Sequence, residues 1–137
     1  MASHRFIVGT VLAAAVVAVA PLATPALASG EHDQRAPEPS SLVLTTTGMD
    51  GSRSVSLLCD PASGNHPAAD QACQALTSAE GDFDKLSGGQ DSMVCTMDYR
   101  PVTASAQGTW RGKPVSFRKE YPNACALRAK TGKVFEF

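Results

Sequence analysis

The stretch from Val102 to Tyr121 reads VTASAQGTWRGKPVSFRKEY and predicts a β-hairpin. Its first half alternates between small or apolar residues and polar residues, so one face of strand 102–111 carries Val102, Ala104, Ala106, Gly108 and Trp110. Gly112-Lys113 supplies a turn, and a second strand is expected over 115–121. We interpret Trp110 as a core residue, since an inward tryptophan on an alternating strand needs no other role.

Three further segments predict strands. Leu42–Thr47 is rich in β-forming residues and is followed by turn-forming residues at 48–51. Ser54–Cys59 places every second residue, namely Val55, Leu57 and Cys59, on one face. The last five residues, Lys133–Phe137, predict a fifth strand.

Two segments predict helices. After Pro67, which suits a first helical turn, the apolar residues fall at helical spacing: Ala69, Ala72, Cys73 and Leu76. Asp82–Ser87 predicts a shorter helix that Gly88 would end. Two helices beside about five antiparallel strands indicate an α+β fold.

The N-terminal residues predict export. Arg5 precedes an apolar run over 6–20, and Ala26-Leu27-Ala28 has the small-x-small pattern of a signal-peptidase site. We therefore expect residues 1–28 to be a cleaved signal peptide, 29–40 a flexible arm and 41–137 the domain, in a secreted, extracellular protein. The remaining 109 residues (137 − 28) hold 11 basic side chains (12 − 1) and 13 acidic ones. This balance argues against nucleic acid, or a membrane after signal cleavage, as a partner.

Four cysteines, Cys59, Cys73, Cys95 and Cys125, follow the predicted signal. An even number in a secreted chain predicts two disulfides, and three pairings are possible. No C-x-x-C spacing is present, and the histidines do not bracket the cysteines as in a zinc site, so no metal is expected.

The sequence contains no convincing catalytic motif, so we expect neither an enzyme nor a cofactor. A Ser–His–Asp site needs a histidine held in place by the fold, and only His66 could be one. His66 precedes a proline, which suggests a turn residue, and the sequence has no G-x-S-x-G motif for a nucleophilic serine. The stretch 108–113 has too few residues between its glycines for a phosphate loop. The acidic residues Asp82, Asp84 and Asp91 lack the spacing of a calcium loop.

The most informative stretch is Met93–Pro101, MVCTMDYRP, which lies between a glycine-rich turn signal and strand 102–111. A segment tied by a disulfide at Cys95 and ending at a proline predicts a restrained, extended loop. Four motifs then resemble the Streptomyces subtilisin inhibitor family: Asn-His-Pro-Ala-Ala at 65–69, Cys-Thr-Met-x-Tyr-x-Pro-Val at 95–102, Gly-x-Trp-x-Gly-Lys at 108–113 and Val-Phe-x-Phe at 134–137. The resemblance extends from about residue 41 to the end of the chain.

This resemblance implies the pairings Cys59–Cys73 and Cys95–Cys125 and a five-stranded antiparallel sheet with two helices on one face. It also implies a homodimer formed through the sheet and a subtilisin-like serine protease as the partner. In a substrate-like inhibitor, P1 is the residue before the reactive bond and P1′ the residue after it. The resemblance makes Met97 P1 and Asp98 P1′, so the reactive bond would be Met97–Asp98.

The other predicted site residues surround this bond. We expect the protease to contact the loop residues Val94, Cys95, Thr96, Tyr99 and Arg100. Pro101, Asn123 and Cys125 are expected to support the loop, with Asn123 bracing it from behind by hydrogen bonds. Two positions depart from the family pattern: P1′ is acidic, and Arg100 replaces an aspartate. Asp98 and Arg100 lie two apart and could partly pair.

Two alternative functions remain open at the level of sequence. The chain could be a secreted interaction protein or transglutaminase substrate that keeps the inhibitor fold, with Gln34 of the arm as an accessible glutamine. The altered loop could instead be directed at a metalloprotease.

Overall fold

The computed structural model describes residues 38–89 and 93–137. The predicted signal peptide at 1–28 and Gln34 of the predicted arm lie outside the described residues, as does Asp91. In the described part of the chain, no helix is long and apolar enough to cross a membrane.

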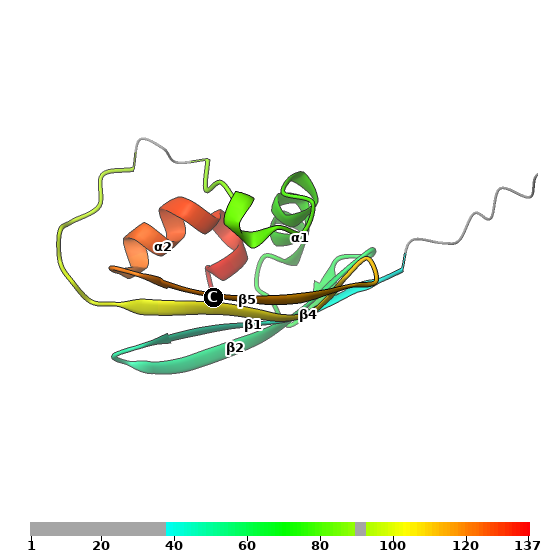
Figure 1. The fold of residues 1–137 in the computed structure, drawn as a ribbon, viewed down its shortest axis with the longest axis horizontal. Coiled ribbons are helices and arrows are strands. Elements are labelled where there is room, and N and C mark those ends of the chain that lie inside the picture. Colours follow the sequence, from blue (N-terminus) through cyan, green and yellow to red (C-terminus); the bar gives the residue numbers. More distant parts are fainter. Residues whose placement is uncertain (1–37, 90–92) are drawn as a thin grey trace, which may run out of the picture. The chain divides into compact units, whose positions relative to one another are not determined.

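The core of the fold is a five-stranded antiparallel sheet with its helices on one face (Figure 1). Its strands run in the order β3-β2-β1-β4-β5. Their bounds are β1 (Ser40–Gly48), β2 (Gly51–Cys59), β3 (Ser63–Gly64), β4 (Val102–Trp110) and β5 (Lys113–Tyr121). The predicted α+β class is therefore confirmed. Strand β1 starts at Ser40, within the predicted arm, and the buried Ser40 Oγ accepts a hydrogen bond from the Arg111 backbone N–H at 3.0 Å.

The β4–β5 hairpin confirms the alternation predicted for it, because Ala104, Ala106 and Trp110 are buried on the helix-covered face. Its two turn residues are Arg111 and Gly112, one position earlier than expected, and both have positive φ (47° and 78°). Two-residue hairpin turns of this kind need positive φ at both central positions, so Gly112 occupies the second of them.

The first predicted helix is confirmed as α1 (Ala69–Ser78), which buries Ala72, Cys73 and Leu76. The second prediction is only partly right. Phe83–Lys85 forms one short 3₁₀ turn, η1, in place of a helix over 82–87. Its start is held by Asp82, whose carboxylate accepts the Asp84 backbone N–H, and the buried Phe83 is the residue that it delivers to the core.

The C-terminal prediction is wrong. The sequence suggested a strand at Lys133–Phe137, whereas the chain forms helix α2 (Ala124–Thr131) followed by the 3₁₀ turn η2 (Gly132–Phe135). A strand would send the adjacent Val134 and Phe135 to opposite faces, but both are buried here under the helices. The short β3 supplies the fifth strand instead.

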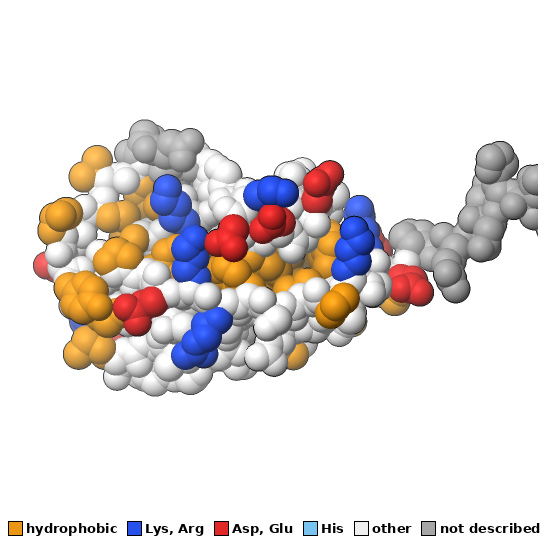
Figure 2. All heavy atoms as spheres, viewed as in Figure 1, with side chains coloured by type: hydrophobic (Ala, Val, Ile, Leu, Met, Phe, Trp, Pro, Cys, Tyr) orange, Lys and Arg blue, Asp and Glu red, His pale blue; other side chains and the backbone are white. Residues whose placement is uncertain are grey.

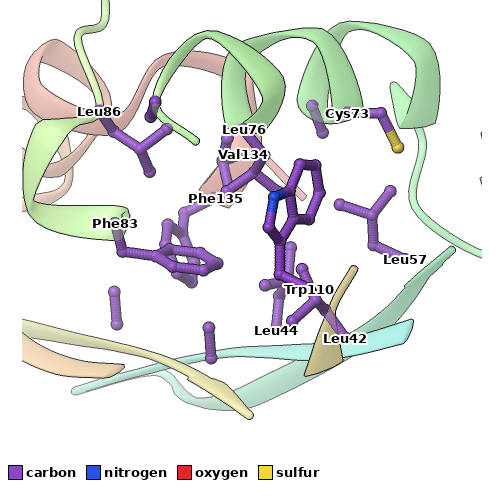
Figure 3. Packing of buried hydrophobic residues seen from close by; sticks show 14 of the residues in the cluster. Leu42, Leu44, Leu57, Cys73, Leu76, Phe83, Leu86, Trp110, Val134 and Phe135 are labelled. Carbon is purple, nitrogen blue, oxygen red and sulfur yellow. The ribbon is translucent and has the colours of Figure 1, made fainter. Parts of the chain in front are cut away.

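Trp110 lies between the sheet and α1, as Figure 3 shows, among Leu42, Leu57 and Leu76. It is 4% exposed, which confirms it as a core residue. Gly81 makes room for its ring, because a Cβ at that position would lie 2.2 Å from Trp110 Cδ1.

His66 lies in the connection between β3 and α1, and its side chain is buried. Its Nδ1 accepts the Ala68 backbone N–H at 3.0 Å, so Nε2 carries the proton and donates to the Val134 carbonyl at 3.1 Å. Burial lowers the pKa of His66, partly offset by the Val134 carbonyl, and this favours the neutral ring. Nε2 thus ties the C-terminal segment to the connection before α1, while Nδ1 holds the local turn at Ala68.

Strands β1 and β4 approach each other so closely at Gly108 that a side chain would not fit there. Its φ is 138°, and a Cβ there would lie 2.0 Å from the Ser41 carbonyl oxygen. We expect Gly108→Ala to lower the free energy of unfolding by about 3 kcal/mol in urea titrations. Gly51→Ala is the matched control, because φ is also positive (115°) but nothing lies within 4 Å of the added Cβ. The control should cost about 1 kcal/mol, and equal losses would contradict a steric origin.

Candidate functional site

The segment 93–101 is an exposed loop without regular secondary structure. This loop, drawn in yellow-green in Figure 1, crosses the end of the domain and leads into β4. Three large hydrophobic side chains project from it into solvent: Val94 is 94% exposed, Met97 99% and Tyr99 71%. In Figure 2, hydrophobic side chains gather at this end of the molecule. The loop therefore displays apolar groups that the core does not use.

A disulfide between Cys95 and Cys125 fastens the loop to the first turn of α2, and a second joins Cys59 at the end of β2 to Cys73 in α1. Both pairings agree with those that the resemblance implied. By closing a 30-residue separation, Cys95–Cys125 restricts the unfolded chain and contributes about 2–4 kcal/mol to stability. It also ties the loop two residues before Met97.

Asn123 lies behind the loop and joins it to α2. Its side-chain Nδ2 donates to the Thr96 carbonyl at 3.1 Å and to the Asp98 carbonyl at 3.0 Å. Its Oδ1 accepts the Ala126 backbone N–H at 2.8 Å and so caps the helix. One amide group thus holds the two carbonyls that flank Met97. The side chain of Met97 points into solvent between these two hydrogen-bonded carbonyls.

The side of the loop beyond Met97 is held by a main-chain contact. The Arg100 N–H donates to the Pro122 carbonyl at 2.9 Å, next to Asn123 in the chain. The Tyr99 hydroxyl also donates to a Glu120 carboxylate oxygen over a longer 3.4 Å. Pro101 then leads directly into β4. The loop is therefore tied before, behind and after Met97.

A groove of about 760 Å³ lies beside this loop. Thr96, Asp98 and Arg100 line it from the loop, and the β1–β2 turn, α2 and the C-terminal residues complete it. The ion pair considered between Asp98 and Arg100 is absent: neither side chain has a salt bridge within 4.0 Å to any residue in 38–89 or 93–137. The carboxylate of Asp98 and the guanidinium of Arg100 therefore do not neutralise each other through a direct contact.

The structure brings together every residue that the sequence placed in the loop or behind it. The sequence reasoning missed the Pro122 carbonyl, the Glu120 carboxylate and helix α2 itself. An asparagine before Ala-Cys-Ala-Leu could have marked the helix start, since Asn is among the preferred N-cap residues. The main-chain acceptor at Pro122 leaves no signal in a sequence.

The described ranges, 38–89 and 93–137, contain no group of three or more His, Cys, Asp or Glu side chains that could hold a metal ion. His66, the one histidine in these ranges, already uses both ring nitrogens within the core. What the geometry offers is an exposed loop tethered to the domain by a disulfide and hydrogen bonds, which is suited to being bound by another protein.

Comparison with known proteins assigns this architecture to a family. The model of the Subtilisin inhibitor-like family matches residues 38–123. Protease inhibitor SIL-V5 of Streptomyces luteoverticillatus is 42% identical over 106 residues, covering 72% of this chain and 98% of that protein. The subtilase-type protease inhibitor of Streptomyces fradiae is 39% identical over 138 aligned positions, covering 96% and 94%.

A solved structure agrees. Streptomyces caespitosus sermetstatin, crystallised in complex with Bacillus licheniformis subtilisin, is 31% identical, with a TM-score of 0.59 and coverage of 72% of this chain and 99% of that one. The chain belongs to the subtilisin inhibitor-like family. These relatives are named as protease inhibitors and not as enzymes, in line with the expectation that the chain is not an enzyme.

Asn123→Asp separates the two tasks of this residue. An aspartate keeps an oxygen for the Ala126 N–H but replaces the donor to Thr96 and Asp98 with a second acceptor. We expect amide hydrogen exchange at Arg100, whose N–H reports loop docking, to accelerate about tenfold while Ala126 stays protected. Asn123→Ala should accelerate exchange at both amides. Unchanged exchange at Arg100 in Asn123→Asp would show that Asn123 does not hold the loop.

Proposed function

We propose that the protein is a secreted inhibitor of subtilisin-like serine proteases that binds through the loop 94–100, with Met97 as P1 and Met97–Asp98 as the reactive bond. The observation that carries this proposal is the exposure of Met97 between two carbonyls held by one buried asparagine. A substrate would offer the same extended backbone. An inhibitor differs in that its backbone is already held in place.

We expect the loop to bind as an extended peptide substrate does. Its main chain can add to the protease cleft as a strand would, while alternate side chains enter pockets. Met97 suits an apolar S1 pocket because its unbranched side chain adapts to varied shapes. Burying it contributes about 1.5–3 kcal/mol, and a restrained loop loses little conformational entropy on binding.

Resistance to cleavage follows from the ties on both sides of the bond. If the protease serine attacks the Met97 carbonyl, the bond to the Asp98 nitrogen breaks and that nitrogen leaves as an amine. The disulfide at Cys95 retains the acyl side, and the Arg100–Pro122 and Asn123–Asp98 hydrogen bonds retain the amine side. The amine therefore stays beside the acyl-enzyme, where re-formation of the peptide bond competes with hydrolysis.

The comparisons support the class of partner. Sermetstatin was crystallised with a subtilisin, and the relatives carry the names of protease or subtilase-type protease inhibitors. The apolar run and Ala-Leu-Ala site near the N-terminus support secretion. No observation in the described residues favours the transglutaminase or metalloprotease alternatives over this proposal.

Met97→Gly is the direct test of the P1 assignment. We expect the wild-type chain to titrate subtilisin at about one to one and Met97→Gly to raise the inhibition constant by about ten- to a hundredfold, since the apolar burial is lost. Met97→Asp should weaken inhibition further by placing a carboxylate in an apolar pocket.

Met49→Gly is the matched control, because Met49 is also exposed (74%) but lies in the β1–β2 turn. It should leave inhibition unchanged.

Mass spectrometry of the complex after long incubation should find a chain cut at Met97–Asp98 and held together by Cys95–Cys125. Full inhibition by both Met97 variants would exclude this loop as the site.

The proposal includes a homodimer formed through the sheet. The face of the sheet away from the helices exposes Val43 (52%) and Leu58 (38%) among short polar side chains, and no helix of the described chain covers it. Light scattering should give twice the mass of the chain, and Val43→Lys should shift the mass to that of the monomer. A wild-type mass equal to one chain would rule the dimer out.

A further inference from the structure

We infer that Asp98 makes this inhibitor selective for proteases whose S1′ pocket, the one that receives the residue after the reactive bond, carries a basic side chain. The inference rests on the proposed function, because it takes Asp98 as P1′. The inference adds to the proposed function the kind of side chain that the partner protease must present beside its catalytic serine.

The backbone is held at Asp98 and again two residues later. The Asp98 carbonyl accepts a hydrogen bond from Asn123, and two residues later the Arg100 N–H is bonded to Pro122. The main chain therefore cannot swing the Asp98 carboxylate away from a bound protease without breaking these contacts. Only rotation of a short side chain remains, so the carboxylate stays close to the reactive bond.

The charge of Asp98 is not neutralised within the described chain. Its carboxylate has no hydrogen bond or salt bridge to any residue in 38–89 or 93–137. Arg53, Arg100 and Arg128 line the same groove, yet none of them pairs with it. By contrast, Asp84 elsewhere on the surface is paired with Lys119 at 2.9 Å. The loop thus presents an exposed, unpaired anion one residue past Met97.

Protease binding changes the environment of this anion. The cleft that receives P1 and P1′ excludes water, and removing an unpaired carboxylate from water is unfavourable. A basic side chain in S1′ compensates by forming a desolvated ion pair, whereas an acidic one adds repulsion. The Asp98 carboxylate therefore strengthens binding to proteases with a basic S1′ pocket and weakens binding to the rest. Its main effect is on which proteases are inhibited, and not on affinity for all of them.

A double-mutant cycle tests the inference. The inhibition constant is measured for wild type and Asp98→Asn against a subtilisin with an uncharged S1′ pocket and against the same enzyme with one lysine introduced into that pocket. We expect Asp98→Asn to tighten inhibition of the unmodified enzyme about tenfold and to weaken inhibition of the lysine enzyme about tenfold. Added salt should reduce the second effect.

Asp70→Asn is the matched control, because it makes the same change in net charge on exposed Asp70 in α1. It should alter neither inhibition constant by more than about twofold. Equal effects of Asp98→Asn on both enzymes, or reproduction of its effects by Asp70→Asn, would overturn the inference while leaving the proposed function intact. A wild-type chain that inhibits neither enzyme would overturn both.

Discussion

The side-chain amide of Asn123 is the interaction on which the displayed loop depends. Its two donor hydrogens go to the carbonyls on either side of Met97, and its oxygen goes to the first turn of α2. All three bonds lie in a group that is only 8% exposed, so water competes poorly for them. The shape of the loop is therefore set by the position of α2, to which the same residue is fixed.

The position of α2 is set in turn by the core. Leu127 anchors the helix, and the η2 turn that follows packs Val134 and Phe135 beneath the helices. His66, far away in the sequence, donates to the Val134 carbonyl and keeps this segment in place. A continuous set of contacts thus runs from the β2–α1 connection through the C-terminal segment to α2. An exposed loop needs such support to keep one shape, because its largest hydrophobic side chains, Val94, Met97 and Tyr99, lie in solvent.

The loop combines an adaptable apolar group with a fixed anion. Met97 can enter many apolar pockets, whereas the unpaired Asp98 is compatible with few neighbours once water is removed. In the proposed mechanism, the ties that retain the two ends of the reactive bond also prevent the backbone from relieving an unfavourable charge at Asp98. If the proposed function holds, the support of the loop and its selectivity arise from the same contacts.

Local patterns predicted much of the fold because they act over a few residues. The alternation in 102–111, the hairpin turn and the apolar face of α1 each depend on neighbours within one element, and each is present. Helix α2 escaped prediction because only Leu127 and Thr131 of its residues are buried, too few to form an apolar stripe. Lys133–Phe137 looked like a strand because its aromatic residues alternate, yet packing under two helices turned it into a 3₁₀ segment.

In the candidate loop too, some features follow from the sequence and others only from the tertiary structure. The sequence by itself determined which residues stand there: a cysteine, an apolar methionine, an acid and a proline, with an asparagine before a later cysteine. It could not determine that Asn123 reaches both carbonyls beside Met97, that Pro122 accepts from Arg100, or that Asp98 has no cation in contact among the described residues. Those facts depend on where α2 and β5 bring residues about 25 positions away. Only the tertiary structure decides such distances, because the free energy that sets them comes from the packing of the whole core.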